Sequence, residues 1–269
     1  MKPRALVRIL NLPRAERNAV LAEGMRLLAE HVAELHADAG LLDEKGRTRG
    51  RAVVDIFAAE QAASYLILLD LARVGWNNDA LAREQIRRFA DHLARGLYLE
   101  AYEASPADLA EIEKYLRFFR RDLFLDGPND DDWVFRREID DRRESSLYVD
   151  YVAYEHENAW VSPAGWRTET RERNTVIDLV THLSNLGMNN TDALDIAADA
   201  WEGIDITDRS LHWQTVKRIN AEVIGALPVT PEATDTDRRR GVALWIHPLN
   251  SLDLTPIKVT MKELREPAS

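Results

Sequence analysis

The sequence predicts a mainly α-helical protein whose core is an antiparallel helical bundle. Three observations support this fold class. Apolar residues recur at helical spacing over most of the first 125 residues, short turns separate these stretches, and 45% of the 269 residues are hydrophobic. Helices joined by short turns are typical of antiparallel bundles, and a chain of this size can bury a substantial core. A small β-hairpin and a C-terminal extension of helices and short strands complete the predicted fold.

The first two helices are expected at about residues 15–42 and 49–74. In the first, apolar residues recur at steps of three and four, the period of an amphipathic helix; they are Leu21, Met25, Leu28, Val32 and Leu35. The second is apolar almost all round, which predicts a central helix packed on several sides. A turn at residues 43–46 separates the two helices, and Gly75 is expected to end the second.

Two further helices are expected before residue 125. The third should start at Asn78 or Asp79 and run through residue 98 or beyond, with an apolar face formed by Ile86, Phe89, Leu93 and Leu97. Ser105, followed by Pro106 and an acidic residue at 108, is a strong signal for the start of the fourth helix. The apolar face of that helix comprises Leu109, Ile112, Tyr115, Leu116 and Phe119.

The rest of the chain is expected to form a linker, a hairpin and a C-terminal region. Residues 126–132 break the helical pattern, and alternating residues around a polar turn at 147–163 predict the hairpin. Helical periodicity then returns at three places, and the tail offers two short strands with a turn at Asn250-Ser251; the helices are expected at 166–187, 190–202 and 207–226, and the strands within 241–262. We therefore predict a bundle at 1–125, a linker and hairpin at 126–165, and a C-terminal helical region with short terminal strands at 166–269.

Composition indicates a cytoplasmic protein that acts without a membrane. The absence of cysteine excludes disulfides and thiolate zinc sites and fits a reducing compartment. The N-terminus lacks the apolar run of a signal peptide, and the most apolar stretch, residues 62–69, is too short to span a bilayer. The net charge of −11 argues against non-specific coating of nucleic acid, but it allows RNA contact at one local basic site.

The candidate chemistry lies in residues 83–95, REQIRRFADHLAR. Four residues separate Arg87 from His92. A histidine can titrate near neutral pH, and a guanidinium can hold a phosphate oxygen. On a continuous helix, Arg88 and Arg95 share a side with His92, whereas Arg87 lies about 140° away. Together, these residues could cleave a phosphodiester without a metal, with either Arg88 on the phosphate or a bend that brings in Arg87. The alternative is a set of ordinary surface ion pairs at i,i+4 spacing.

Glu60 is a second candidate because it interrupts an apolar helix. Burying a lone carboxylate is costly, so we expect a partner, an arginine on a neighbouring helix, and a structural role in preference to general-base catalysis. No metal or other cofactor is expected. The chain has no Glu-x-x-His element, His156-Glu157 lacks a second histidine because residue 160 is Trp, and no Gly-rich phosphate loop occurs.

Three segments together resemble the AbiV-type abortive-infection proteins of the HEPN superfamily. Residues 35–74 resemble the first helical hairpin of that family. The segment ADHLAR, 90–95, resembles its His-x-x-Lys element, and residues 142–152 with 160–163 resemble its later Tyr-Val-Asp segment. The resemblance covers about residues 15–165. The chain departs from the pattern at Ser64, where lysine is common, and at Arg95, which replaces the lysine after His92.

This resemblance implies a dimeric, metal-independent ribonuclease. Many HEPN proteins carry an Arg-x(4–6)-His motif, which Arg87 and His92 fit, and bring two motifs together across a homodimer. It implies that His92 is general acid or base and that Arg87 or Arg88 stabilises the transition state. We assign Arg95 and Glu60, on their own residue types and positions, to binding.

The implied activity is antiviral defence. An RNA substrate and a phage-encoded trigger protein are expected, and the triggered toxin would shut down host RNA or translation. One alternative is a non-catalytic HEPN interaction module that senses a phage protein or blocks translation by binding. Another is a helical ligand-binding or regulatory protein with no toxic activity.

Overall fold

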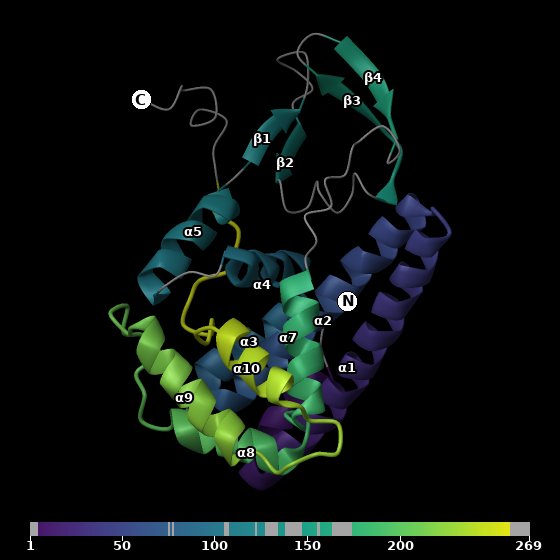
Figure 1. Ribbon diagram of the computed structural model, residues 1–269. Helices are drawn as coiled ribbons and strands as arrows, with labels where there is room; N and C mark the ends of the chain where they lie inside the picture. Colours follow the sequence, from purple (N-terminus) through teal and green to yellow (C-terminus); the bar gives the residue numbers. More distant parts are fainter. Residues whose placement is uncertain are drawn as a thin grey trace.

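Helices dominate the computed structural model (Figure 1). It describes residues 5–74, 76, 78–104, 108–121, 123–126, 134–137, 147–154, 157–162 and 174–258. The helical elements are η1 (Leu6–Asn11), α1 (Arg14–Glu44), α2 (Thr48–Arg73), α3 (Asp79–Phe89), α4 (His92–Ala104), α5 (Leu109–Arg121), α7 (Asn174–Asn185), α8 (Thr191–Trp201), α9 (Trp213–Ala226) and α10 (Asp235–Leu244). The prediction of a mainly α-helical protein is confirmed.

Helices α1 and α2 form a long hairpin, as the sequence predicts. The turn between them contains Gly46 at φ 65°, a left-handed conformation that glycine adopts without a steric penalty. Helix α2 is the central helix and packs against α1, α3, α4, α7 and α8. Its Ala58, Ala59, Ala62 and Ala63 are all buried, because small side chains let neighbouring helices approach closely.

Helix α2 is long and apolar enough to cross a membrane, by length and hydropathy alone. No stretch of this length was predicted from the sequence. Residues buried inside the protein make up 67% of its most apolar window. Core packing therefore accounts for its apolar composition.

The prediction of a single helix from residue 78 to 98 is wrong, because this stretch forms two helices, α3 and α4. Asn78 caps α3 as expected, and its side chain accepts hydrogen bonds from the amides of Ala80 and Leu81. The helix ends at Phe89, and Asp91 then accepts a hydrogen bond from the Ala94 amide at 3.2 Å. An aspartate that caps a new helix competes with continuation of the old one, which explains the break.

Helix α5 begins at Leu109, where the Asp108 side chain accepts a hydrogen bond from the Glu111 amide at 2.8 Å. The expected cap at Ser105 and Pro106 lies outside the described residues. Two antiparallel strand pairs follow. Strand β1 (Leu123–Asp126) pairs with β2 (Val134–Arg137), and β3 (Asp150–Tyr154) pairs with β4 (Glu157–Val161), within the range where a hairpin was expected.

The C-terminal helices agree only in part with the sequence prediction. Helix α7 ends shortly before Gly187, which has φ 79° as a helix-ending glycine should, but the expected start at 166 lies outside the described residues. Helix α9 starts six residues later than the predicted 207, at Trp213. Helix α10 was not predicted, although Thr234 and Asp237 form a capping box at its start.

The predicted strand at 242–248 is wrong. Its first residues belong to α10, and the chain from Trp245 onward has no regular secondary structure up to residue 258, where the description ends. Its apolar side chains, among them Trp245, Leu249 and Leu252, are buried against the helices. The apolar composition of this segment therefore reflects core packing of irregular backbone and not pairing in a sheet.

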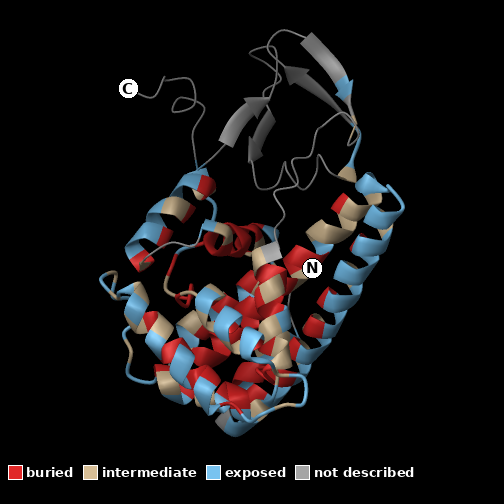
Figure 2. Ribbon diagram, in the orientation of Figure 1, coloured by how far each residue is buried: buried red, intermediate tan, exposed pale blue. Residues whose placement is uncertain are grey.

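One continuous hydrophobic core extends from Ile9 to Leu254 and includes residues of α1 to α5 and α7 to α9. Figure 2 shows these buried residues gathered where α2, α4 and α7 meet. A smaller cluster unites Trp201, Ile206, Val216 and Ile219. The C-terminal helices thus share a core with the N-terminal bundle, and α2 lies at its centre.

Candidate functional site

The break between α3 and α4 decides which of the candidate residues come together. It places His92 at the first residue of α4 and Arg95 one turn later. Both face Glu60, which lies in the middle of the central helix α2. Two residues of α4 therefore meet Glu60, which lies about thirty residues earlier in the chain, where α4 packs against α2.

Glu60 is a shared acceptor at this crossing. Its Oε2 lies 3.0 Å from Nδ1 of His92 and 3.4 Å from Nη1 of Arg95. The side chain of Glu60 is 8% exposed and that of Arg95 is 11% exposed, whereas that of His92 is 51% exposed. The prediction that Glu60 pairs with an arginine on a neighbouring helix is confirmed, and His92 is an additional partner.

Arg95 also contacts the His92 ring. Its Nη2 lies 3.1 Å from Nδ1 and 3.5 Å from Nε2. A position in the ring plane at both distances would overlap Cε1, so Nη2 lies out of the ring plane, toward one face of the imidazole. Oε2 of Glu60 is therefore the hydrogen-bond partner of Nδ1. Because a carboxylate only accepts, we assign a proton to Nδ1, which donates it to Glu60.

This tautomer has a chemical consequence. When Nδ1 carries the proton, Nε2 keeps its lone pair and can accept a proton from another molecule. Half of the His92 side chain is exposed, so such a molecule can approach. Glu60 then acts as the residue that orients the ring, as a carboxylate does in other histidine-dependent sites.

Arg87 lies on α3 with its side chain 68% exposed, and it forms a salt bridge with Glu84 one turn earlier. Within the described part of the chain, no hydrogen bond or ion pair joins Arg87 to His92. The structure therefore gathers Glu60, His92 and Arg95, while Arg87 stands apart from them in a single protomer.

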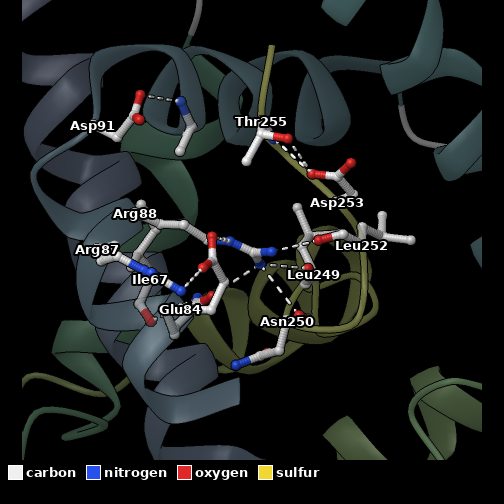
Figure 3. Close-up of polar contacts among 12 residues, drawn as sticks. Ile67, Glu84, Arg87, Arg88, Asp91, Leu249, Asn250, Leu252, Asp253 and Thr255 are labelled. Atoms are coloured by element: carbon white, nitrogen blue, oxygen red, sulfur yellow. Dashed lines mark hydrogen bonds and ion pairs between the residues drawn. The ribbon is translucent and has the colours of Figure 1, made fainter. Parts of the chain in front are cut away.

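Arg88 is buried and contacts the C-terminal segment, not His92 (Figure 3). It donates hydrogen bonds to the backbone carbonyls of Leu249 at 3.0 Å and Asn250 at 3.3 Å, and also to that of Leu252. The helical-wheel argument that set Arg88 beside His92 fails because the helix breaks between them. Its guanidinium is directed into the protein, which leaves it unable to reach a phosphate at His92.

Sequence reasoning missed a buried polar network beneath the site. Asp70 and Arg73, both on α2 and fully buried, form an ion pair at 2.8 Å. Burial raises the pKa of Asp70, although Arg73, the Leu249 amide and the Tyr98 hydroxyl all act in the opposite direction. Arg73 also lies over the rings of Trp201 and Trp245. Polar residues within an apolar helix were the available signal, but the sequence does not identify their partners.

No group of three or more His, Asp or Glu side chains in the described ranges could hold a metal ion. The acidic residues 130–132 lie outside those ranges, as does His156, whose incomplete zinc pattern is noted above.

Comparison with known proteins adds one finding. The model of the AbiV family of HEPN proteins matches residues 20–181, which carry Glu60, Arg87, His92 and Arg95. No curated protein and no solved structure matches the chain. Because the family match spans more than half of the 269 residues, this chain belongs to the AbiV family of the HEPN proteins.

Proposed function

We propose that this protein is an abortive-infection effector that cleaves RNA without a metal ion, with His92 as the acid–base residue. The observation that carries the proposal is the arrangement of His92: Nδ1 faces the buried Glu60 at 3.0 Å, while half of the side chain is open to solvent. A histidine held by a carboxylate on one side and accessible on the other is suited to proton transfer.

The proposed reaction needs only proton transfer and charge stabilisation. Nε2 of His92 accepts the proton of an RNA 2′-hydroxyl, and the oxygen attacks the adjacent phosphorus. The bond from phosphorus to the 5′-oxygen breaks, and a proton donor protonates this leaving oxygen. The products are a 2′,3′-cyclic phosphate and a free 5′-hydroxyl. Arginine stabilises the additional negative charge on the phosphoryl oxygens in the transition state.

Arg87 is the proposed source of that arginine, supplied across a homodimer. It is exposed and lies apart from His92 in one protomer, so a second protomer that presents its own α3 would complete the site. Its present partner Glu84 is 28% exposed and also lies 3.7 Å from Nε of Arg88, so Glu84 keeps a cation if Arg87 moves away. Arg87 itself is mostly in water, where an ion pair is worth about 1 kcal/mol or less. A phosphate could therefore displace Glu84 from Arg87.

Light scattering tests the proposed homodimer. For the full chain at micromolar concentration it is expected to give twice the mass of 30.7 kDa.

Purified protein and an end-labelled RNA test the proposal. Wild type is expected to produce fragments that end in 2′,3′-cyclic phosphate, with EDTA present. His92→Ala and Arg87→Ala should each lose cleavage while keeping the wild-type circular dichroism spectrum. Arg83→Ala removes another exposed arginine of α3 and is the matched control for general attraction of RNA. If His92→Ala cleaves as fast as wild type, the ribonuclease proposal is wrong.

The second candidate is a non-catalytic interaction module that senses a phage protein or blocks translation by binding. The separation of Arg87 from His92, and the pairing of Arg87 with Glu84, favour this candidate. It predicts that His92→Ala, in a stable protein, retains full toxicity in cells and that no RNA is cut.

A further inference from the structure

The C-terminal segment 245–257, called here the strap, is held by arginines from distant parts of the chain. Their guanidinium groups donate hydrogen bonds to successive backbone carbonyls of the strap. The contacts are Arg73 to Ile246 at 3.0 Å, Arg88 to Leu249 at 3.0 Å, Arg209 to Ser251 at 3.5 Å, and Arg120 to Thr255 at 2.7 Å. Among the described residues no strand pairs with the strap, so these donors take the place of the backbone pairing that a strand would have.

Arg88 connects the strap to a closed polar network. Its Nη1 donates to Oε1 of Gln85 at 3.1 Å, and Nε2 of Gln85 donates to the Tyr98 hydroxyl. That hydroxyl donates to Oδ2 of Asp70 at 2.9 Å. The amide of Leu249, in the strap, donates to the same Oδ2 at 2.8 Å, so the chain of hydrogen bonds leads back to the residue that Arg88 contacts.

The network joins the three helices that carry the candidate site. Asp70 is on α2 with Glu60, Gln85 and Arg88 are on α3 with Arg87, and Tyr98 is on α4 with His92. Gln85, Asp70 and Tyr98 have no exposed surface, and Arg88 is 4% exposed. Buried hydrogen bonds are costly to break because the groups left behind lack water, so this network fixes the helices relative to one another.

Arg88 is also next to the corner where α3 gives way to α4. Its backbone carbonyl accepts a hydrogen bond from the Asp91 amide at 3.0 Å, and Asp91 caps α4 directly before His92. The side chain of Arg88 is thus anchored in the strap while its backbone forms the corner (Figure 3). Only three residues separate Arg88 from His92, so a shift of Arg88 would be transmitted to His92 through a short stretch of chain.

We infer that the strap, acting through Arg88 and the buried network, positions the α3–α4 corner and keeps Nδ1 of His92 against Glu60. Arg88 and Tyr98 are then positioning residues that touch no substrate. The inference rests on the proposed role of His92. It also assigns a role in the site to the C-terminal end of the chain, beyond the residues that the family model matches.

Nuclear magnetic resonance of the full chain, with ¹⁵N-labelled histidine, tests the inference at a pH where His92 is neutral. Imidazole nitrogen shifts report which nitrogen carries the proton, and His92→Asn identifies the signal among the seven histidines. Wild type should show the Nδ1–H tautomer. Glu60→Ala should lose it, and Arg88→Lys should lose it too, because an ammonium cannot reach three carbonyls in a fixed planar fork. Arg120→Lys is the matched control, since Arg120 binds the same strap from α5.

The outcomes separate positioning from simple stabilisation. Loss of the Nδ1–H signal in Arg88→Lys but not in Arg120→Lys supports the inference. Retention of that signal in Arg88→Lys, or its loss to the same extent in both variants, overturns it, as does its absence from wild type. If Arg88→Lys does not fold, Tyr98→Phe removes the link between α4 and Asp70 and is judged by the same signal. The readout does not depend on RNA cleavage, so an inactive protein would refute the proposed function without affecting this result.

Discussion

Glu60→Ala should lower the stability of the protein substantially. The substitution removes the carboxylate that faces Arg95 at 3.4 Å and His92 at 3.0 Å. Breaking a buried ion pair by removing one partner costs about 3–5 kcal/mol. The Arg95 side chain is 11% exposed and fits that case, whereas His92 is half exposed and can regain water. We therefore expect a loss near the lower end, about 3 kcal/mol, in the free energy of unfolding.

Thermal and urea unfolding at neutral pH measure this effect. A loss of that size should lower the melting temperature by roughly 6–12 °C in a chain of this length. Glu60→Gln keeps an acceptor oxygen and the shape of the side chain, so its loss should be smaller. A double-mutant cycle with Arg95→Met should give a coupling energy of about 0.5–3 kcal/mol, as expected for residues in contact. An unchanged melting temperature in Glu60→Ala would refute the reasoning, because it would mean that this carboxylate contributes nothing to folding.

Two further predictions concern residues outside the helices, His247 in the strap and Gly187 in the turn after α7. Burial lowers the pKa of His247 despite its hydrogen bond to a backbone carbonyl, so the unfolded chain takes up a proton before the folded one does. Stability should therefore fall as the pH drops below about 6.5, and His247→Gln should weaken this fall in urea midpoints; an identical pH dependence in the variant would contradict it. Gly187→Ala should destabilise the protein by about 1–2 kcal/mol, because alanine is strained at the φ of 79°. The loss should exceed that of Gly203→Ala, since a Cβ at 187 would meet other side chains at 3.0–3.1 Å and a Cβ at 203 would meet nothing within 4 Å. Equal melting temperatures for these two variants would contradict this prediction, because they would mean that the close contacts of a Cβ at 187 cost no stability.

Periodicity predicts the helices best where one face is buried and the ends carry strong signals. Helices α1 and α2 were located to within a few residues because their apolar spacing is regular and a glycine turn separates them. The break at residues 90 and 91 could not be predicted because Ala90 and His92 fit a helix, and Asp91, at i,i+4 spacing from Arg87 and Arg95, fits the surface ion pairs of the alternative interpretation. Its role as a cap depends on a backbone conformation that the sequence does not state.

Partners of buried polar groups were predicted less completely. The apolar surroundings of Glu60 indicated that it needs a cation, and arginine on a neighbouring helix is what the structure contains. Arg88 was assigned to the phosphate because it is an arginine one turn from His92. Its partners are carbonyls more than 160 residues away in the chain. Such contacts follow from tertiary packing, and the spacing of residues within one helix does not predict them.

Induced expression in a bacterium tests the central claim, RNA cleavage by His92, most directly. Growth and the integrity of total RNA are followed after induction of wild type and of His92→Ala at matched protein levels. We expect wild type to arrest growth while RNA fragments with 2′,3′-cyclic phosphate ends accumulate, and we expect His92→Ala to do neither. Growth arrest by His92→Ala equal to that of wild type, with intact RNA in both, would contradict the claim and favour action by binding.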